Sequence, residues 1–307
     1  MVEVNTSDGV SPITIGVVTH ARRTVAFAKL LKFLAPAIRH YGGEVELLVT
    51  NNSGESHGDA VRQEVANSGI ADVCSWRVVD SPENNITVGR NLLMENASHR
   101  LMAVVDDDEY PIESWLSALV SGHQQLASPI VGGPIEPIYQ PGVAHWIRQI
   151  DVHNGRGLKT GDKVDFIASG NFLIDLEAAG KTRFDPGFGK TGGGDTEFFL
   201  RLKDAGITIR WVEEALVEED IPLEKSTVRY VIRRSMSQGS NYRRIMQARG
   251  EISSVALFVL KAALVFLGSL CLALVLILFR HQRAGDWMKR AFSNLGKLWQ
   301  PDRPLYQ

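Results

Sequence analysis

Four consecutive acidic residues, Asp106 to Glu109, follow directly after the apolar segment LMAVV at 101–105. Carboxylates this close repel one another, and a hard divalent cation such as Mg²⁺ or Mn²⁺ relieves that repulsion while binding the phosphates of a substrate. A solvated acidic turn is the alternative explanation. We favour a metal site, because the run lies where a buried strand is expected to end, at the edge where parallel sheets bind ligands.

A glycine loop, Gly192-Gly193-Gly194, ends at Asp195 and leads into the amphipathic segment DTEFFLRL at 195–202. Asp195 is a suitable N-cap for a helix that starts here. A carboxylate beside a glycine loop is also able to accept a proton from a substrate hydroxyl. Both roles are open at this point.

The segments around these motifs alternate between short apolar runs and helical spacing. We expect strands at 13–19, 45–50, 76–80 and 101–109, with helices at 25–41, 59–68 and 87–98 between them. Pro36 is expected to break or kink the first helix. This alternation predicts an α/β fold whose mixed, mostly parallel sheet is covered on both faces.

The 307 residues are 44% hydrophobic and 22% charged, which excludes a disordered chain, a collagen-like repeat and a disulfide-stapled miniprotein. Cys74 and Cys271 are too few and too far apart for a disulfide framework or a thiolate metal site. Residues 1–224 hold 19 basic and 32 acidic residues, a charge of −13, whereas residues 225–307 hold 14 and 3, a charge of +11. We therefore expect no nucleic-acid partner, and we expect the basic part to bind anionic membrane lipid.

The rear part contains an apolar 25-residue segment, 255–279, whose only charged residue is Lys261. As a helix it reaches roughly 37 Å at about 1.5 Å per residue, enough to cross a hydrocarbon core of about 30 Å. A buried core helix is the alternative, and we favour the membrane. The polar first residues predict no signal peptide, so we expect a catalytic domain facing the cytoplasm at the cytoplasmic membrane.

Basic residues flank this segment on both sides, and the positive-inside rule predicts that both flanks lie in the cytoplasm. A re-entrant hairpin turning at Gly268–Ser269 satisfies the rule, and a single span with an external tail is the other interpretation. Residues 281–307 predict an amphipathic interfacial helix with Trp287 and Trp299 on its apolar face. The predicted parts are thus a catalytic domain at 1–225, a basic arm at 226–253, a membrane helix at 254–280 and an interfacial tail at 281–307.

Five segments occur in an order that resembles glycosyltransferase family 2, the inverting enzymes with the GT-A fold for nucleotide-diphospho-sugars. They are ITIGVVTHARR (13–23), VELLVTNNSG (45–54), SPENNITVGRN (81–91), VVDDDEYP (104–111) and SGNFLIDLEAAGKTRFDPGFGKTGGGDTEFFLRL (169–202). The resemblance covers roughly residues 13–235. With its hydrophobic C-terminal segment, the chain resembles bacterial exopolysaccharide enzymes of the succinoglycan type.

The resemblance implies roles for particular residues. In the DxD motif, Asp106 would contact the ribose or the metal, and Asp108 would ligate the Mg²⁺ or Mn²⁺ that bridges the donor diphosphate. Asp195 would be the catalytic base. The nucleotide would be bound by Thr19, Arg22, Asn51, Arg90, Asn91, Asp106 and Asp107. Arg233 and Arg234 would either clamp the leaving diphosphate or belong to a basic, lipid-facing helix.

Three positions depart from the family pattern. Asn51 replaces the usual aspartate after the second strand, although its amide oxygen is still able to accept from uracil N3–H. Gly194 replaces the glutamate of the Glu-Asp pair, and the loop Val18-Thr19-His20 lacks the customary proline. These departures leave open which nucleobase the donor carries. They also leave Asp195 without the glutamate that usually precedes it.

The resemblance implies transfer of one sugar, with inversion, from a nucleotide-diphospho-sugar, a UDP-sugar being favoured. The absence of the QxxRW motif of processive synthases and the single hydrophobic segment predict one addition per encounter. A polyprenyl-linked saccharide at the membrane is the expected acceptor. The alternatives are a sugar nucleotidyltransferase, for which the glycine-rich phosphate loop is missing, and a non-catalytic membrane-tethered module that binds nucleotide sugars.

Overall fold

The computed structural model describes residues 10–53, 58–148, 150, 155, 157–279 and 281–299, and the chain divides into two compact units. The first comprises residues up to Glu136, Gly157–Phe184 and Phe198–Glu218. The second comprises Pro137–Arg156, Asp185–Glu197 and the chain from Glu219 onward. The units therefore interleave along the sequence.

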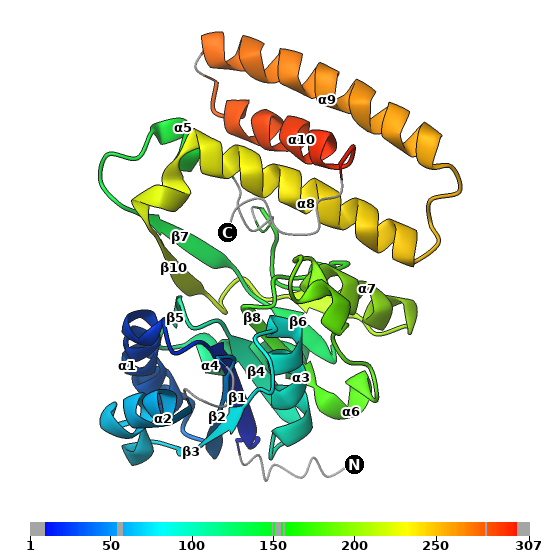
Figure 1. Ribbon diagram of the computed structural model, residues 1–307. Coiled ribbons are helices and arrows are strands. Elements are labelled where there is room, and N and C mark those ends of the chain that lie inside the picture. The colour runs from blue at the N-terminus through cyan, green and yellow to red at the C-terminus, as the bar shows by residue number, and fades with distance from the viewer. Residues whose placement is uncertain are drawn as a thin grey trace, which may run out of the picture. The chain divides into compact units, whose positions relative to one another are not determined.

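The first unit is built on a seven-stranded sheet in the order β3-β2-β1-β4-β8-β6-β9 (Figure 1). Strands β1 to β4 are parallel to one another, whereas β8 runs antiparallel to both of its neighbours. The predicted mixed, mostly parallel sheet is confirmed. The strand bounds are β1 Ile13–Thr19, β2 Val45–Asn51, β3 Ser75–Asp80, β4 Leu101–Val105, β6 Ile130–Gly132, β8 Asn171–Asp175 and β9 Ile209–Trp211.

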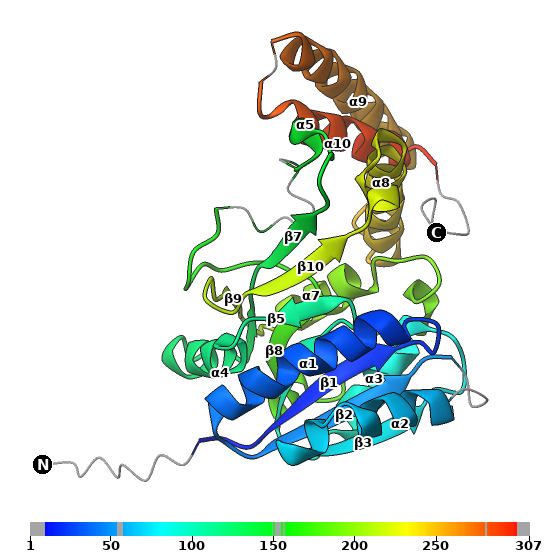
Figure 2. The ribbon, with the colours of Figure 1, turned by 90° about the vertical axis from the view of Figure 1, so that its left-hand side faces the viewer.

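Helices cover both faces of this sheet, and each face has its own apolar core. One core joins α1 (Thr24–Tyr41), α2 (Gly58–Asn67) and α4 (Trp115–Gln125) to the sheet, and Figure 2 shows α1 lying along β1. The other core joins α3 (Ile86–Asn96) and the C-terminal part of α7 (Gly194–Asp204) to the opposite face. Burial of apolar strand residues on both faces explains why the strand sequences are continuously hydrophobic.

Two local predictions were wrong. The first helix is not broken at Pro36, because α1 continues through it to Tyr41. The strand predicted at 101–109 ends at Val105, and Glu109–Pro111 forms a separate strand, β5. Strand β5 belongs to a three-stranded sheet with β10 (Val217–Ile221) and β7 (Ile135–Tyr139). Residues 106–108 therefore form a tight connection between two sheets. The remaining short helices are Ile70–Asp72, α5 (His145–Arg148), α6 (Leu176–Ala179), Pro186–Phe188 and Leu223–Ser226.

Three long helices dominate the second unit: α8 (Val228–Ala248), α9 (Val255–Leu278) and α10 (Ala284–Gly296). Helix α10 lies between α8 and α9, as Figure 1 shows. Glycines allow α8 and α10 to approach closely, because a Cβ on Gly239 would collide with the backbone of Ser293 and one on Gly296 with that of Met236. Of the described helices, α9 is the one long and apolar enough to cross a membrane.

Helix α9 is continuous from Val255 to Leu278. The hairpin predicted at Gly268–Ser269 is therefore wrong, because both residues lie within the helix and Ser269 is buried. The predicted amphipathic tail is present as α10, but its apolar side packs in the helix layer, with the ring of Phe292 against that of Phe266 on α9.

Candidate active site

The carboxyl ends of β1, β2 and β3 place Thr19, Asn51 and Asp80 side by side in register. The Asn51 amide nitrogen donates to Asp80 Oδ1 at 2.8 Å, and its oxygen accepts from the Ser53 backbone N–H at 3.0 Å. Arg62 donates to the other Asp80 oxygen at 2.5 Å. Asn51 is thus fixed by a carboxylate that the sequence analysis did not single out.

Beside this row, Asp107 is the buried aspartate of the acidic run. Asp107 is 3% exposed, accepts from Thr19 Oγ1 at 2.8 Å and lies 3.2 Å from a guanidinium nitrogen of Arg23. Burial raises the pKa of Asp107 to about 7, against the opposing effects of Arg23 and the Thr19 hydrogen bond. The neighbouring acids Asp108 and Asp106 raise this pKa further. The structure therefore brings together two of the residues that were predicted to bind the nucleotide, Thr19 and Asp107.

The two outer acids of the motif are partly exposed and each contacts an arginine. Asp106 Oδ1 lies 3.1 Å from a guanidinium nitrogen of Arg90, and Asp108 is ion-paired with Arg23. Among the described residues, no group of three His, Cys, Asp or Glu side chains converges on one point. Two accessible carboxylates fit a magnesium-type ion that takes its remaining ligands from diphosphate and water, because such ions use one or two protein carboxylates.

Helix α3 is positioned by asparagines from two loops. Asn85 caps it by accepting from the Thr87 N–H at 3.2 Å, and the Asn85 N–H donates to Asn52 Oδ1 at 3.0 Å. This arrangement fixes Arg90 on the first turns of α3, where it reaches Asp106. The amide of Asn91 instead makes both of its hydrogen bonds to the Phe184 backbone, at 2.8 and 2.7 Å, which joins α3 to the segment before the glycine loop.

Asp195 belongs to the second unit, which includes Asp185–Glu197. Helix α7 begins at Gly194, so the predicted N-cap role is wrong: Asp195 lies in the first turn, and its Oδ1 accepts from the Thr196 N–H at 2.8 Å. The preceding Gly193 has a φ of 87°, and a Cβ there would approach Asn241 Cβ on α8 to 3.0 Å. The partly exposed candidate base therefore follows directly after a loop residue, Gly193, that packs against α8.

The adjacent residues Arg22 and Arg23 have different surroundings in the structure, as do Arg233 and Arg234. Arg22 is exposed, and its backbone N–H donates to His20 Nδ1 at 3.1 Å. Arg23, which the sequence analysis passed over, is the one that contacts the acidic run. On α8, Arg233 is exposed, whereas Arg234 lines a pocket of the second unit. The sequence did contain a signal for Arg23. Arg22 and Arg23 follow the first strand and Asp106–Glu109 follow the fourth, so a contact between an arginine and an acid could be expected.

Comparison with known proteins defines the class. The fold is similar to that of GalNAc-T7 solved with UDP, GalNAc and Mn²⁺, with a TM-score of 0.54 at 17% identity over 78% of this chain and 48% of that one. It is also similar to S. aureus TarS 1–349 in complex with UDP-GlcNAc, with a TM-score of 0.51 at 12% identity over 81% of this chain and 76% of that one. The chain thus spans about half the length of GalNAc-T7, and it has the GT-A glycosyltransferase fold.

The sequence matches the model of Glycosyl transferase family 2 over residues 14–182, which is more than half of the chain. The chain belongs to glycosyltransferase family 2, as its motif order predicted. It is also 28% identical, over 236 residues, to the succinoglycan biosynthesis protein ExoM of Rhizobium meliloti (strain 1021). That match covers 76% of this chain and 75% of ExoM.

Proposed function

We propose that this glycosyltransferase moves one sugar, with inversion, from a nucleotide-diphospho-sugar to a lipid-linked saccharide in the synthesis of a bacterial surface or exopolysaccharide. The observation that carries the proposal is the joining of the acidic run to Thr19, Arg23 and Arg90 at the carboxyl edge of the sheet. Similarity to ExoM supports the polysaccharide pathway. Family membership favours glycosyl transfer over the nucleotidyltransferase and the non-catalytic module.

The donor is assigned to the first unit. Asn51 and Asp80 at the ends of β2 and β3 would contact the base, while Arg90 and Arg23 supply positive charge for the diphosphate. The complexes of GalNAc-T7 with UDP and of TarS with UDP-GlcNAc support a uridine nucleotide. The amide oxygen of Asn51 accepts from the Ser53 N–H and has a second lone pair, which would accept from uracil N3–H.

Asp106 and Asp108 would hold Mg²⁺ or Mn²⁺, which when bound neutralises negative charge on the leaving diphosphate. The Mn²⁺ in the GalNAc-T7 structure supports a divalent ion. Arg90 and Arg23 fix the orientation of these two carboxylates through their ion pairs. Buried Asp107 acts indirectly, by tying Thr19 of β1 to the run.

Asp195 would accept the proton of the acceptor hydroxyl as its oxygen attacks the anomeric carbon. The bond from that carbon to the diphosphate oxygen breaks on the opposite face, so the configuration inverts. A positioned general base contributes about 10²–10⁴-fold to such a rate. The glycine loop before Asp195 packs against α8, within the unit that holds the apolar helix, so the candidate base and the membrane helices share one unit.

The second unit would attach the enzyme to the cytoplasmic membrane with α9 lying in the membrane plane. Its buried residues Ala262, Ser269 and Ala273 form one stripe, and α10 is the element packed along it. If α9 crossed the bilayer, it would draw Lys289 and Arg290 of α10 toward the hydrocarbon, at about 2.5–3.5 kcal/mol for each charge at the centre. An in-plane helix avoids this cost and keeps both basic flanks in the cytoplasm.

Product analysis tests the proposal. The purified full-length protein is incubated with UDP- and GDP-linked sugars, with a divalent metal and with a lipid extract containing polyprenyl-linked saccharides, and the lipids are analysed by mass spectrometry. The proposal requires a lipid product heavier by one sugar residue and the release of one nucleoside diphosphate. Formation of a nucleotide sugar from a sugar phosphate would identify a nucleotidyltransferase instead.

A further inference from the structure

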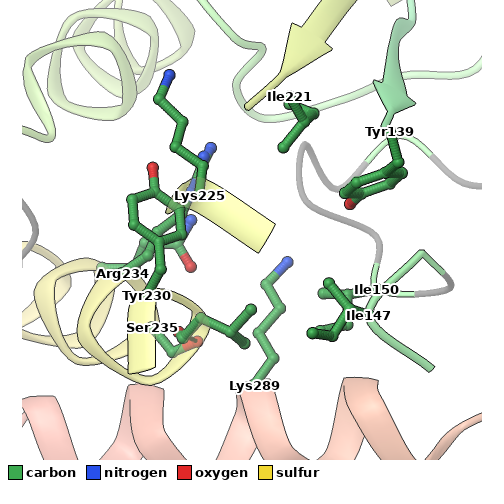
Figure 3. A pocket seen from close by; sticks show the side chains of 11 residues that line it. Tyr139, Ile147, Ile150, Ile221, Lys225, Tyr230, Arg234, Ser235 and Lys289 are labelled. Carbon is green, nitrogen blue, oxygen red and sulfur yellow. Dashed lines mark hydrogen bonds between the residues drawn. The ribbon is translucent and has the colours of Figure 1, made fainter. Parts of the chain in front are cut away.

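A pocket of about 470 Å³ lies within the second unit, lined by side chains from β7, β10, α5, α8 and α10. Figure 3 shows Lys289 rising from α10 toward its middle, with Ile147 and Ile150 on one side and Tyr230 and Arg234 on the other. This volume includes space that is open to solvent. The catalytic residues discussed above do not line it.

The lining combines two chemistries. Lys225, Arg234 and Lys289 bring three cationic groups to one pocket, and Ile147, Ile150 and Ile221 give it an apolar wall. The described lining residues include no acid; Glu219, just outside, lies 3.7 Å from Lys225 and offsets one positive charge. A pocket that is cationic and apolar at once matches an anionic group attached to a hydrocarbon chain.

The surroundings distinguish a lipid from a soluble anion. Helix α10, which supplies Lys289, packs along α9, whose leucines 257, 260, 264 and 267 are exposed. Helix α8, which supplies Arg234, also supplies Asn241, the contact of the loop before Asp195. The same two helices therefore join the pocket to the apolar surface and to the candidate base.

We infer that this pocket binds the diphosphate and the first isoprene units of a polyprenyl-diphosphate-linked acceptor. The inference rests on the proposed function and names the part of the acceptor that the second unit recognises. Lys289 and Arg234 contact the phosphates, and the isoleucines contact the chain. Arg234 thus serves the acceptor and not the leaving diphosphate of the donor, which the sequence had left as one of its possible roles.

The test measures binding separately from turnover. Full-length protein in phosphatidylcholine nanodiscs is titrated with a fluorescent polyprenyl diphosphate, for the wild type, Lys289→Gln and Arg234→Gln. Arg229→Gln is the matched control, because Arg229 is an exposed cation on α8 that does not line the pocket. We expect each pocket variant to weaken binding about tenfold, the loss of one charge-assisted contact, and the control to stay within about twofold. UDP binding should be unchanged in all three variants, which establishes that they are folded.

Two competitors identify the ligand's source. Inorganic pyrophosphate and phosphatidylglycerol, each at the phosphate concentration of the probe, should displace little of it. Equal competition by either one, or wild-type affinity in both pocket variants, overturns the inference. Transfer assays separate the two proposals: a wild type that transfers no sugar from any donor refutes the proposed function, whereas a wild type that transfers normally beside pocket variants with unchanged KM for the acceptor refutes the pocket alone.

Discussion

Arg23 lies 3.2 Å from the buried carboxylate of Asp107, and this ion pair joins the start of α1 to the acidic connection between β4 and β5. The same guanidinium is ion-paired with Asp108. These acids raise the pKa of Arg23 although burial lowers it, so the group stays charged. A cation on the loop that follows β1 therefore holds together the carboxyl ends of β1 and β4.

The neighbouring arginines provide a controlled test of this contact. Arg23→Gln should lower the free energy of unfolding by about 1–2 kcal/mol, because Asp107 remains buried without its cation and Arg23 itself is partly solvated. Arg22→Gln, which removes the same charge from an exposed side chain, should change it by at most about 0.5 kcal/mol. Urea unfolding followed by circular dichroism measures both. Equal effects would show that only the net charge matters.

The outer carboxylates are tested through metal dependence. Asp108→Ala should abolish metal-dependent sugar transfer while the circular dichroism spectrum stays native, because the Asp108 side chain is partly exposed. Titration with Mg²⁺ and Mn²⁺ after treatment with EDTA measures the dependence. Full wild-type activity in EDTA, or unchanged activity of the variant, would remove the metal from the mechanism.

Asp195 is tested by a substitution that preserves its local hydrogen bond. In Asp195→Asn the side-chain oxygen is still able to accept from the Thr196 N–H, but the amide is no base at neutral pH. We expect kcat to fall by at least about 10²-fold with donor affinity nearly unchanged. Steady-state kinetics and isothermal titration with UDP separate the two quantities. Near-normal kcat would exclude Asp195 as the base.

The sequence predicted the first unit well because its signals are local. The strand at 13–19 was predicted to the residue, and 45–50 to within one residue, because continuous apolar runs bounded by turn residues leave few alternatives. The acidic run was correctly placed directly after the apolar segment 101–105, although the predicted strand was extended through it to residue 109. Pro36 misled the prediction, since tertiary packing of Leu31, Leu34 and Ile38 holds one continuous helix around it.

The three C-terminal helices lie within the predicted segments, but the full composition of the second unit was not predicted, because its other segments are distant in sequence. Segments 137–156 and 185–197 join the C-terminal helices, and no local pattern marks this. Glycine has a low helix propensity, yet Gly239 and Gly296 are the positions where α8 and α10 approach closely. The sequence also does not show which of Arg22 and Arg23 contacts the acidic run, because this depends on where α1 begins.

Glu46 predicts how stability depends on pH. Burial raises its pKa, but hydrogen bonds from Ser98, Arg77 and Thr14 outweigh this and hold the pKa below 4.5. Since the folded pKa lies below the unfolded one, the ionised group stabilises the fold above the unfolded pKa, and this contribution is lost as the pH falls through the folded value. The difference in unfolding free energy between the wild type and Glu46→Gln should shrink from about pH 6 to about pH 3. A constant difference would contradict this assignment.

The in-plane position of α9 is tested by labelling both of its ends. Ser253→Cys and Gln282→Cys are made separately in a Cys271→Ser background, because Cys271 is the exposed native thiol. Cys74 needs no replacement: burial raises its pKa to about 11, so almost no reactive thiolate exists at neutral pH.

A membrane-impermeant maleimide is then applied to intact cells and to inside-out vesicles. If α9 lies in the plane of the cytoplasmic leaflet, both new cysteines are protected in intact cells and both react in vesicles. A helix that crosses the bilayer leaves one end outside, so Gln282→Cys would react in intact cells while Ser253→Cys would not. Protein recovered in the cytosol after cell lysis without detergent would instead refute membrane attachment by α9. Since α10 packs along α9, the position of this helix also decides whether Lys289 lies where a lipid diphosphate is able to reach it.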